Sequence, residues 1–262
     1  MSKYSLSRRR FLQSTGTAAI WLPATVKGYT ANEMQALYVD GVMQENISKW
    51  ELDTPALCVD LDLMETNIAT MQSTTIRNGI ACRPHAKTHK TPIIAQMQLD
   101  SGAVGICTAK ISEAEAMFQH GIEEILMTTT NVTPTKIRRA MTLRYSCDSF
   151  IQATDSLNNA RLLSEAAGAA GVIADVVVDV DPGGHRTGIT PGQPALQLAQ
   201  AIDSLPSLRL RGLLCYDGGS QHIKGFEQRK TQTLERLTAA TETYDLFVGA
   251  GLNTDIFSGG GT

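Results

Sequence analysis

Short apolar runs alternate with longer, mixed stretches from about residue 52 to residue 262. The runs are rich in Val, Ile and Leu, which is typical of strands buried on both faces of a parallel sheet. Proline follows threonine at Thr91-Pro92, Thr133-Pro134 and Thr190-Pro191, an arrangement that predicts helix starts. Eight strands are predicted, at 56–60, 80–83, 104–108, 124–128, 149–153, 175–180, 208–214 and 255–257.

Repeated strand–helix units predict a parallel α/β sheet with right-handed crossovers. Eight such strands would close a (β/α)8 TIM-type barrel, and an open doubly wound sheet is the alternative. Polar and glycine residues gather just after the strands, as at 85–90, 181–186 and 216–222. Because a barrel has its active site at that end of its strands, we favour the barrel. The pattern stops at 258–262 without a last helix, so we expect a truncated barrel over residues 52–262.

The overall composition and charge argue against some classes of partner. Of the 262 residues, 42% are hydrophobic and 19% are charged, an ordinary balance for a globular α/β domain. The net charge of −3 gives no electrostatic reason to expect nucleic acid or an anionic membrane surface as a partner. The five cysteines are scattered, so no disulfide framework is predicted.

The first 30 residues read as an export signal and not as part of the fold. The run Ser7-Arg8-Arg9-Arg10-Phe11-Leu12 matches the twin-arginine pattern S-R-R-x-F-L-K, with Gln13 in place of the lysine. The apolar stretch that follows, 17–23, is too short to span a bilayer. We predict a twin-arginine signal segment at 1–30, a linker at 31–51, passage through the twin-arginine export machinery and a periplasmic location. An uncleaved anchor and a disordered basic tail are the alternatives.

The segment 83–90, RPHAKTHK, holds the strongest candidate for chemistry. It follows a predicted strand and places Lys87 between His85 and His89. A lysine held in a cavity loses its proton readily and can form a Schiff base with a carbonyl. Lys87 and His85 are therefore the candidate catalytic residues, and a solvated basic loop is the alternative. The His85–His89 spacing suits a helix whereas the segment looks extended, so no metal site is predicted here.

The last five residues have the form of a phosphate-binding loop. Successive glycines let backbone N–H groups converge on an anion, and Ser and Thr hydroxyls add donors. A loop after the last strands of a barrel is a frequent phosphate site, and a flexible tail is the alternative. The candidate residues are Ser258, Gly259, Gly260, Gly261 and Thr262.

Two further side chains follow predicted strands. Arg186 lies in a glycine-bearing turn, where its fork of donors could hold a ring nitrogen or an anion. Tyr216 ends another strand and could pack on a planar cofactor. A solvated arginine and a half-buried core tyrosine are the alternatives.

Together these segments resemble the D-threonine aldolase and D-serine dehydratase-like enzymes. These are pyridoxal phosphate enzymes with a barrel of the alanine racemase N-terminal type. The resemblance runs from about Asp53 to the last residue. It rests on the segments DTPALCVDLD, RPHAKTHKT, CTAKISEAEAM, DPGGHRTG, GLLCYDGGSQH and SGGGT, in this order.

The resemblance implies the cofactor pyridoxal 5'-phosphate and a role for each candidate residue. Lys87 would carry the cofactor as an internal aldimine, Arg186 would lie near the pyridine nitrogen, and Tyr216 would lie beside the ring. The phosphate would be surrounded by Ser258, Gly259, Gly260, Gly261 and Thr262.

The implied activity is that of a lyase on D-configured β-hydroxy amino acids, by aldol cleavage or by loss of the β-hydroxyl. Members of the family continue into a β-rich domain with ligands for a divalent metal, manganese or zinc, and we expect those ligands to be absent here. An amino-acid racemase and a non-catalytic or inactive cofactor-binding barrel are the alternatives. A small D-amino acid is the expected substrate, and a homodimer is one open arrangement.

Overall fold

The computed structural model describes residues 28–39 and 42–260. Residues 1–27 of the predicted export signal lie outside these residues, as do Gly261 and Thr262 of the predicted phosphate loop. The chain divides into two compact units, residues 1–66 and residues 67–262.

The first unit contains short elements with local caps. Thr30 begins a helix, and its side chain forms a reciprocal capping box with that of Glu33. Ser48 and Glu51 form a second capping box. The elements are α2 (Ala31–Ala36), the antiparallel pair β1 (Tyr38–Val39) and β2 (Val42–Met43), and the 3-10 helix η1 (Lys49–Glu51). Helix α3 (Leu61–Arg77) contains the boundary between the two units.

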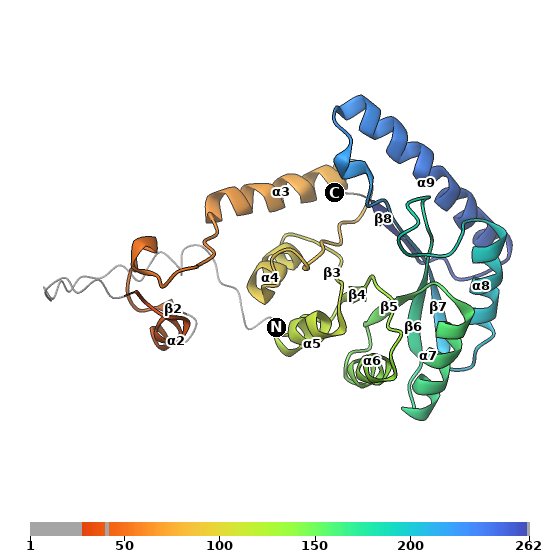
Figure 1. Ribbon diagram of the computed structural model, residues 1–262, viewed down its shortest axis with the longest axis horizontal. Helices are drawn as coiled ribbons and strands as arrows, with labels where there is room; N and C mark the ends of the chain where they lie inside the picture. The colour runs from red at the N-terminus through yellow and green to blue at the C-terminus, as the bar shows by residue number, and fades with distance from the viewer. Residues whose placement is uncertain (1–27, 40–41, 261–262) are drawn as a thin grey trace, which may run out of the picture. The chain divides into compact units, whose positions relative to one another are not determined.

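The second unit is a curved parallel sheet with helices on its outer side (Figure 1). Its strands pair in sequence order, and right-handed crossovers between strands in this order place all the helices on the same side of the sheet. The strands are β3 (Ile106–Thr108), β4 (Ile125–Met127), β5 (Ile151–Thr154), β6 (Ala174–Asp179), β7 (Leu208–Tyr216) and β8 (Ile256–Gly260). The helices are α4 (Pro92–Asp100), α5 (Ile111–Gln119), α6 (Pro134–Ser146), α7 (Leu157–Ala169), α8 (Gln193–Asp203), the 3-10 helix η2 (Ser220–His222) and α9 (Phe226–Gly249).

Two of the eight predicted strands are not regular strands. Residues 80–86 run beside β3 with a single parallel bridge, His85 to Cys107. Pro84 accepts a hydrogen bond there from Cys107 N at 2.7 Å, but proline has no N–H to return, so a continuous ladder cannot form. Residues 56–60 are extended without a ladder and belong to the first unit, where the Leu57 side chain is fully exposed.

Helix starts follow the predictions in part. α4 and α6 begin at the predicted Thr-Pro pairs. α8 begins two residues later than predicted, because Gly192 has the positive φ of 79° and donates its N–H to Thr243 Oγ1 instead of joining a helical turn.

The sheet is buried on both faces, as the apolar runs predicted. Along β6, Val176 and Val178 belong to the large cluster under the helices, whereas Val177 belongs to a smaller cluster on the inner side. The inner cluster also contains Cys107, Leu126, Ile151, Ala153 and Leu214. One strand therefore contributes to two separate cores through the period-two alternation of its side chains.

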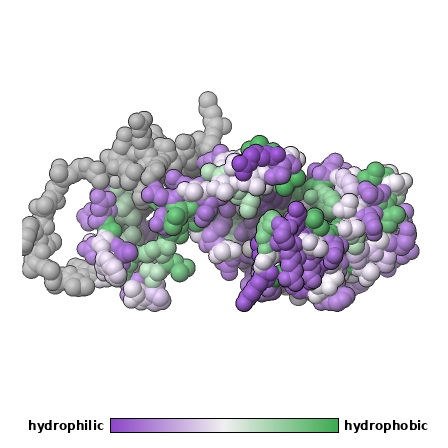
Figure 2. Space-filling model, turned by 90° about the horizontal axis from the view of Figure 1, so that it is seen from above, coloured by the Kyte–Doolittle hydropathy of each residue, from purple (hydrophilic) through white to green (hydrophobic). Residues whose placement is uncertain are grey.

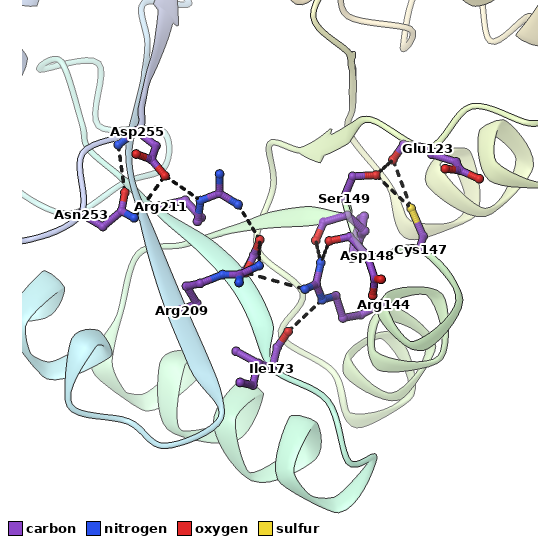
Figure 3. Close-up of polar contacts among 12 residues, drawn as sticks. Glu123, Arg144, Cys147, Asp148, Ser149, Ile173, Arg209, Arg211, Asn253 and Asp255 are labelled. Carbon is purple, nitrogen blue, oxygen red and sulfur yellow. Dashed lines mark hydrogen bonds and ion pairs between the residues drawn. The ribbon is translucent and has the colours of Figure 1, made fainter.

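A charged cluster lies on the inner side of the sheet, at the amino ends of β6 and β7 (Figure 3). The Asp175 carboxylate is buried and accepts two hydrogen bonds from Arg209, at 2.6 and 2.8 Å, and one from Arg211 at 2.7 Å. Arg144 of α6 lies 3.9 Å from the same carboxylate. Arg211 also pairs with the exposed Asp255 at 3.4 Å. We call Asp175, Arg144, Arg209 and Arg211 the floor cluster.

None of the helices in the described part of the chain combines the length and the apolar character needed to cross a bilayer. On the face seen in Figure 2, hydrophobic residues are interspersed with hydrophilic ones.

Candidate functional site

A cavity of about 220 Å³ lies at the carboxyl ends of the strands, the end opposite the floor cluster. In a parallel barrel-type sheet this end receives the loops that follow every strand. The predicted residues that line the cavity are Lys87, His85, Arg186, Tyr216, Ser258, Gly259 and Gly260. The structure thus brings together all the predicted site residues that it describes, although they are spread along the sequence from residue 85 to residue 260.

A tight turn, Ala86–Lys90, positions Lys87. Lys90 N donates to Ala86 O at 2.8 Å, which closes one helical turn around Lys87. Ala86 N donates to Cys107 O at 2.8 Å and so ties this turn to the end of β3. Lys90 has a positive φ of 51° and its ammonium lies 3.7 Å from Glu113, outside the cavity lining.

The Tyr216 ring is in contact with two cationic side chains. Lys87 Nζ is 5.1 Å from the centre of the Tyr216 ring, and Arg186 Cζ is 5.0 Å from the same centre. Both distances are within the range of a cation–π contact. Lys87, Arg186 and Tyr216, which are distant from one another in the sequence, therefore form one group in the structure.

His85 is a neutral residue of the cavity wall. Its pKa is lowered to about 4, mainly by burial and also by the nearby charge of Lys87, against smaller opposing effects of Glu113 and a hydrogen bond with Cys107. Its Nδ1 accepts from Lys87 N at 3.2 Å, and its Nε2 lies 3.2 Å from Thr128 Oγ1.

Asp179 is a cavity residue to which the sequence analysis gave no role. Its carboxyl is buried, and burial raises its pKa to about 6 although the Thr187 hydrogen bond opposes the rise. Asp181, two residues on, accepts hydrogen bonds from the backbone N–H groups of Gly183, Gly184 and His185 at 2.8 to 3.1 Å. This carboxylate therefore holds the turn that delivers Arg186.

A second cavity, of about 560 Å³, adjoins the first and shares Asp179, Arg186, Thr187 and Tyr216 with it. Its far wall is built on Asp217, whose carboxylate accepts from Gly219 N at 2.9 Å, from Arg236 at 2.8 Å and from the Ser220 hydroxyl. Burial alone would raise the pKa of Asp217, but these hydrogen bonds together lower it. The carboxylate form is thus stabilised as the anchor of this loop.

Ser258, Gly259 and Gly260 form the end of β8 and not a loop, which corrects the prediction that the strand stops at residue 257. They continue the ladder with β7, and Asp217 N donates to Gly260 O at 2.8 Å. A Cβ at Gly259 would lie 2.6 Å from Cys215 O, so only glycine allows this close approach. At Gly260, with φ of 127°, a Cβ would meet nothing within 4 Å, so open space adjoins the backbone there.

The arrangement fits pyridoxal phosphate. It offers a primary amine, an aromatic ring beside it, a guanidinium that also contacts that ring, and glycine backbone next to open space at one edge. The described residues offer no comparable site for a divalent metal, because they contain no group of three or more His, Cys, Asp or Glu that could hold an ion.

Fold and site together define a barrel-type α/β domain with a lysine-bearing cavity at the carboxyl ends of its strands. The family model of the alanine racemase N-terminal domain matches residues 59–260, and the chain belongs to that family.

Several relatives in this family have names that describe their reactions. The chain is 34% identical to the 3-hydroxy-D-aspartate aldolase of Paracoccus denitrificans (strain Pd 1222), over 81% of this chain and 55% of the relative. It is 36% identical to the D-threonine aldolase of an Arthrobacter species, over 80% of this chain and 55% of the relative. The chain spans about half the length of the curated relatives it matches.

Solved structures agree with this assignment. The D-threonine aldolase of Filomicrobium marinum superimposes with a TM-score of 0.78 at 38% identity, over 81% of this chain and 57% of that one. The D-threo-3-hydroxyaspartate dehydratase of Delftia sp. HT23 gives a TM-score of 0.72 at 31% identity, over 79% of this chain and 55% of that one.

Proposed function

We propose that this chain is the cofactor-binding part of a pyridoxal phosphate-dependent lyase that acts on D-configured β-hydroxy amino acids. Lys87 is the residue that holds the cofactor. The observation that carries the proposal is the grouping of Lys87, Tyr216 and Arg186 within one cavity that ends at the glycines of β8. The names of the relatives support the substrate class, since both aldolases and a dehydratase act on D-hydroxy amino acids.

Each residue has a task that follows from its chemistry. Pyridoxal phosphate, when bound, supplies the electron sink for breaking a bond at Cα. Lys87 supplies the amine nucleophile, and the turn tied to β3 keeps that amine inside the cavity. Tyr216 supplies a flat wall, and Arg186 supplies a permanent positive charge next to that ring.

Absorbance of the purified protein tests the assignment of Lys87. A lysine-bound pyridoxal group absorbs in the near-violet, and reduction with borohydride removes this band and fixes the label on the lysine. We expect the band in the natural protein and in Lys90→Ala, and its loss in Lys87→Ala. Lys90 is a matched control, because it lies three positions on and its side chain is 60% exposed. A band that persists in Lys87→Ala would overturn the assignment.

The reaction is tested by adding substrates to the loaded protein. We expect glycine and an aldehyde from D-threonine if aldol cleavage is the activity, or a keto acid and ammonia from D-serine if β-elimination is. Manganese or zinc, which we propose as activating ions, should increase either rate. Interconversion of D- and L-alanine without cleavage would instead support a racemase. A bound cofactor without turnover of any of these substrates would support a non-catalytic barrel.

We also propose that the protein is exported to the periplasm through the twin-arginine machinery. The support is the Ser7–Leu12 pattern. The double substitution Arg8→Lys with Arg9→Lys should leave the protein in the cytoplasm, because the machinery reads the arginine pair. Arg10→Lys is the matched control, and it should be exported as before. Equal export of both variants would refute the signal.

A further inference from the structure

The two histidines that flank Lys87 make the same backbone contact. His85 Nδ1 accepts a hydrogen bond from the N–H of Lys87, two residues on, at 3.2 Å. His89 Nδ1 accepts from the N–H of Thr91, again two residues on, at 3.0 Å. Thr91 Oγ1 also donates to His89 O at 2.7 Å. The turn that carries Lys87 is therefore held by an imidazole at each end.

These contacts determine which ring nitrogen carries the proton. A backbone N–H can only donate, so each Nδ1 must offer its lone pair, and a neutral ring then has its hydrogen on Nε2. For His85 that hydrogen points to Thr128 Oγ1 at 3.2 Å, and Thr128 Oγ1 in turn donates to Thr108 O at 3.2 Å. Thr128 thereby selects the tautomer of His85 that can accept from Lys87.

His89 has a corresponding environment. Its Nε2 and Gln98 Oε1 are both buried, and neither atom has a hydrogen-bond partner of normal geometry among the described residues. Burial lowers the pKa of His89, and the interaction with Gln98 opposes this more weakly. Both rings are thus held in the neutral form that the backbone contacts require.

We propose that His85 and His89 are positioning residues, which brace the Lys87 turn through Nδ1 and thereby aim the Lys87 amine into the cavity. They are not the groups that transfer protons to the substrate. This inference rests on the proposed function for the role of Lys87, while the brace itself rests on the two backbone contacts. It is an alternative to the expectation from the sequence that His85 is catalytic.

Two substitutions at position 85 separate the two ring nitrogens. In His85→Asn the amide oxygen can take the place of Nδ1 and accept from Lys87 N, whereas nothing reaches Thr128. In His85→Gln the longer amide can reach Thr128 from the place of Nε2, whereas nothing accepts from Lys87 N. The two variants differ by one hydrogen bond, the one that the Lys87 N–H donates. We therefore expect pyridoxal phosphate to attach to Lys87 about tenfold faster in His85→Asn than in His85→Gln.

Attachment is measured by growth of the near-violet band and by the labelled Lys87 peptide after borohydride reduction. A second readout needs no cofactor: hydrogen exchange at the Lys87 amide should be slow in the natural protein and in His85→Asn, and faster in His85→Gln. The pair His89→Asn and His89→Gln should show the same order for the Thr91 amide. Thermal unfolding of each variant checks that the fold is retained.

The outcomes distinguish the two proposals. If the natural protein forms no band that depends on Lys87, the proposed function fails, and amide exchange still tests the brace. If that band forms but His85→Asn and His85→Gln attach cofactor and exchange equally, the brace is refuted. Normal attachment in both variants with equal loss of substrate turnover would instead assign His85 to proton transfer.

Discussion

His85 and Asp179 line the same cavity, and burial shifts their pKa values in opposite directions. The pKa of His85 falls from 6.5 to about 4, and that of Asp179 rises from 3.8 to about 6. Burial disfavours the charged form of either group, which is the cation for histidine and the anion for aspartate. At neutral pH the cavity therefore holds an uncharged imidazole, and Asp179 is close to its titration range.

These shifts predict two opposite effects of pH on stability. Between pH 6.5 and about 4 the unfolded chain binds a proton at His85 that the folded protein does not, so acidification favours unfolding. Between about pH 6 and 3.8 the folded protein holds a proton at Asp179 that the unfolded chain has released, so acidification favours folding. The two effects oppose each other over nearly the same range.

Urea unfolding at about pH 4.5 and about pH 7.5 checks this prediction. Relative to the natural protein, His85→Asn should be more stable at the lower pH than at the higher one, because it lacks the group that acid destabilises. Asp179→Asn should show the reverse, because it lacks the carboxylate that is costly to bury above pH 6. If each variant differs from the natural protein by the same free energy of unfolding at both pH values, the pKa shifts are contradicted.

The reactive side chains of the cavity could be predicted from the sequence, but the residues that surround them could not. Lys87, Arg186 and Tyr216 were predicted because each is a distinctive residue after a predicted strand, and the structure brings them together. The roles of Thr128 and Asp179 were missed, since a threonine and an aspartate gain them only from neighbours distant in sequence. The regular spacing of the two histidines was visible, but its use for backbone contacts was not.

At the scale of single elements, an irregularity in β7 sets which side chains face the site. Val176 pairs with Leu210 and Val178 with Leu213, so β7 has one extra residue next to Gly212. Before this bulge Arg209 and Arg211 face inward to Asp175, and after it Leu214 and Tyr216 face inward. Without the extra residue the alternation would place Cys215 and not Tyr216 in the cavity.

Gly212→Ala tests the importance of that bulge. Gly212 has φ of 127°, and a Cβ would press on the carbonyl oxygen of Ile256 in β8. We expect a loss of at least ~2 kcal/mol in the free energy of unfolding, from backbone strain and overpacking.

Gly249→Ala is the control, because Gly249 lies in α9 with nothing within 4 Å of the added Cβ. It should be neutral or stabilising by up to about 1 kcal/mol. Equal stability of the two variants would contradict the argument.

The apolar runs of the sequence predict the paired strands well. Strands flanked by partners in sequence order were found within a few residues, because apolar runs report burial on both faces. The prediction of a regular strand at 80–83 was wrong, because Pro84 has no backbone N–H to donate to a ladder. The glycine after Leu208-Arg209-Leu210-Arg211 was a signal for the bulge, since an isolated glycine inside a strand often marks one.

Across the second unit, the inner side of the sheet changes character from one end of the strands to the other. The floor cluster lies at the amino ends, an apolar layer with Leu126, Val177 and Leu214 follows, and the cavity lies at the carboxyl ends. In barrel-type folds the amino end serves stability and the carboxyl end serves chemistry. The three arginines of the floor cluster depend on one buried carboxylate, so its loss should act on the whole unit.

Asp175→Asn tests this dependence. The substitution keeps the shape of the side chain but leaves Arg144, Arg209 and Arg211 without their shared anion. Because the Arg209 and Arg211 side chains keep access to solvent, at 51% and 26% exposed, we expect a loss of about 1.5–3 kcal/mol, the range for a hydrogen bond to a charged group. Asp255→Asn is the matched control: it also removes a partner of Arg211, but its side chain is 59% exposed, so we expect a loss of at most about 1 kcal/mol. Urea unfolding followed by circular dichroism measures both. The Lys87-dependent absorbance band should survive in folded Asp175→Asn, because the floor cluster does not line the cavity. Losses of similar size in the two variants would show that the floor cluster is not the support that its burial indicates.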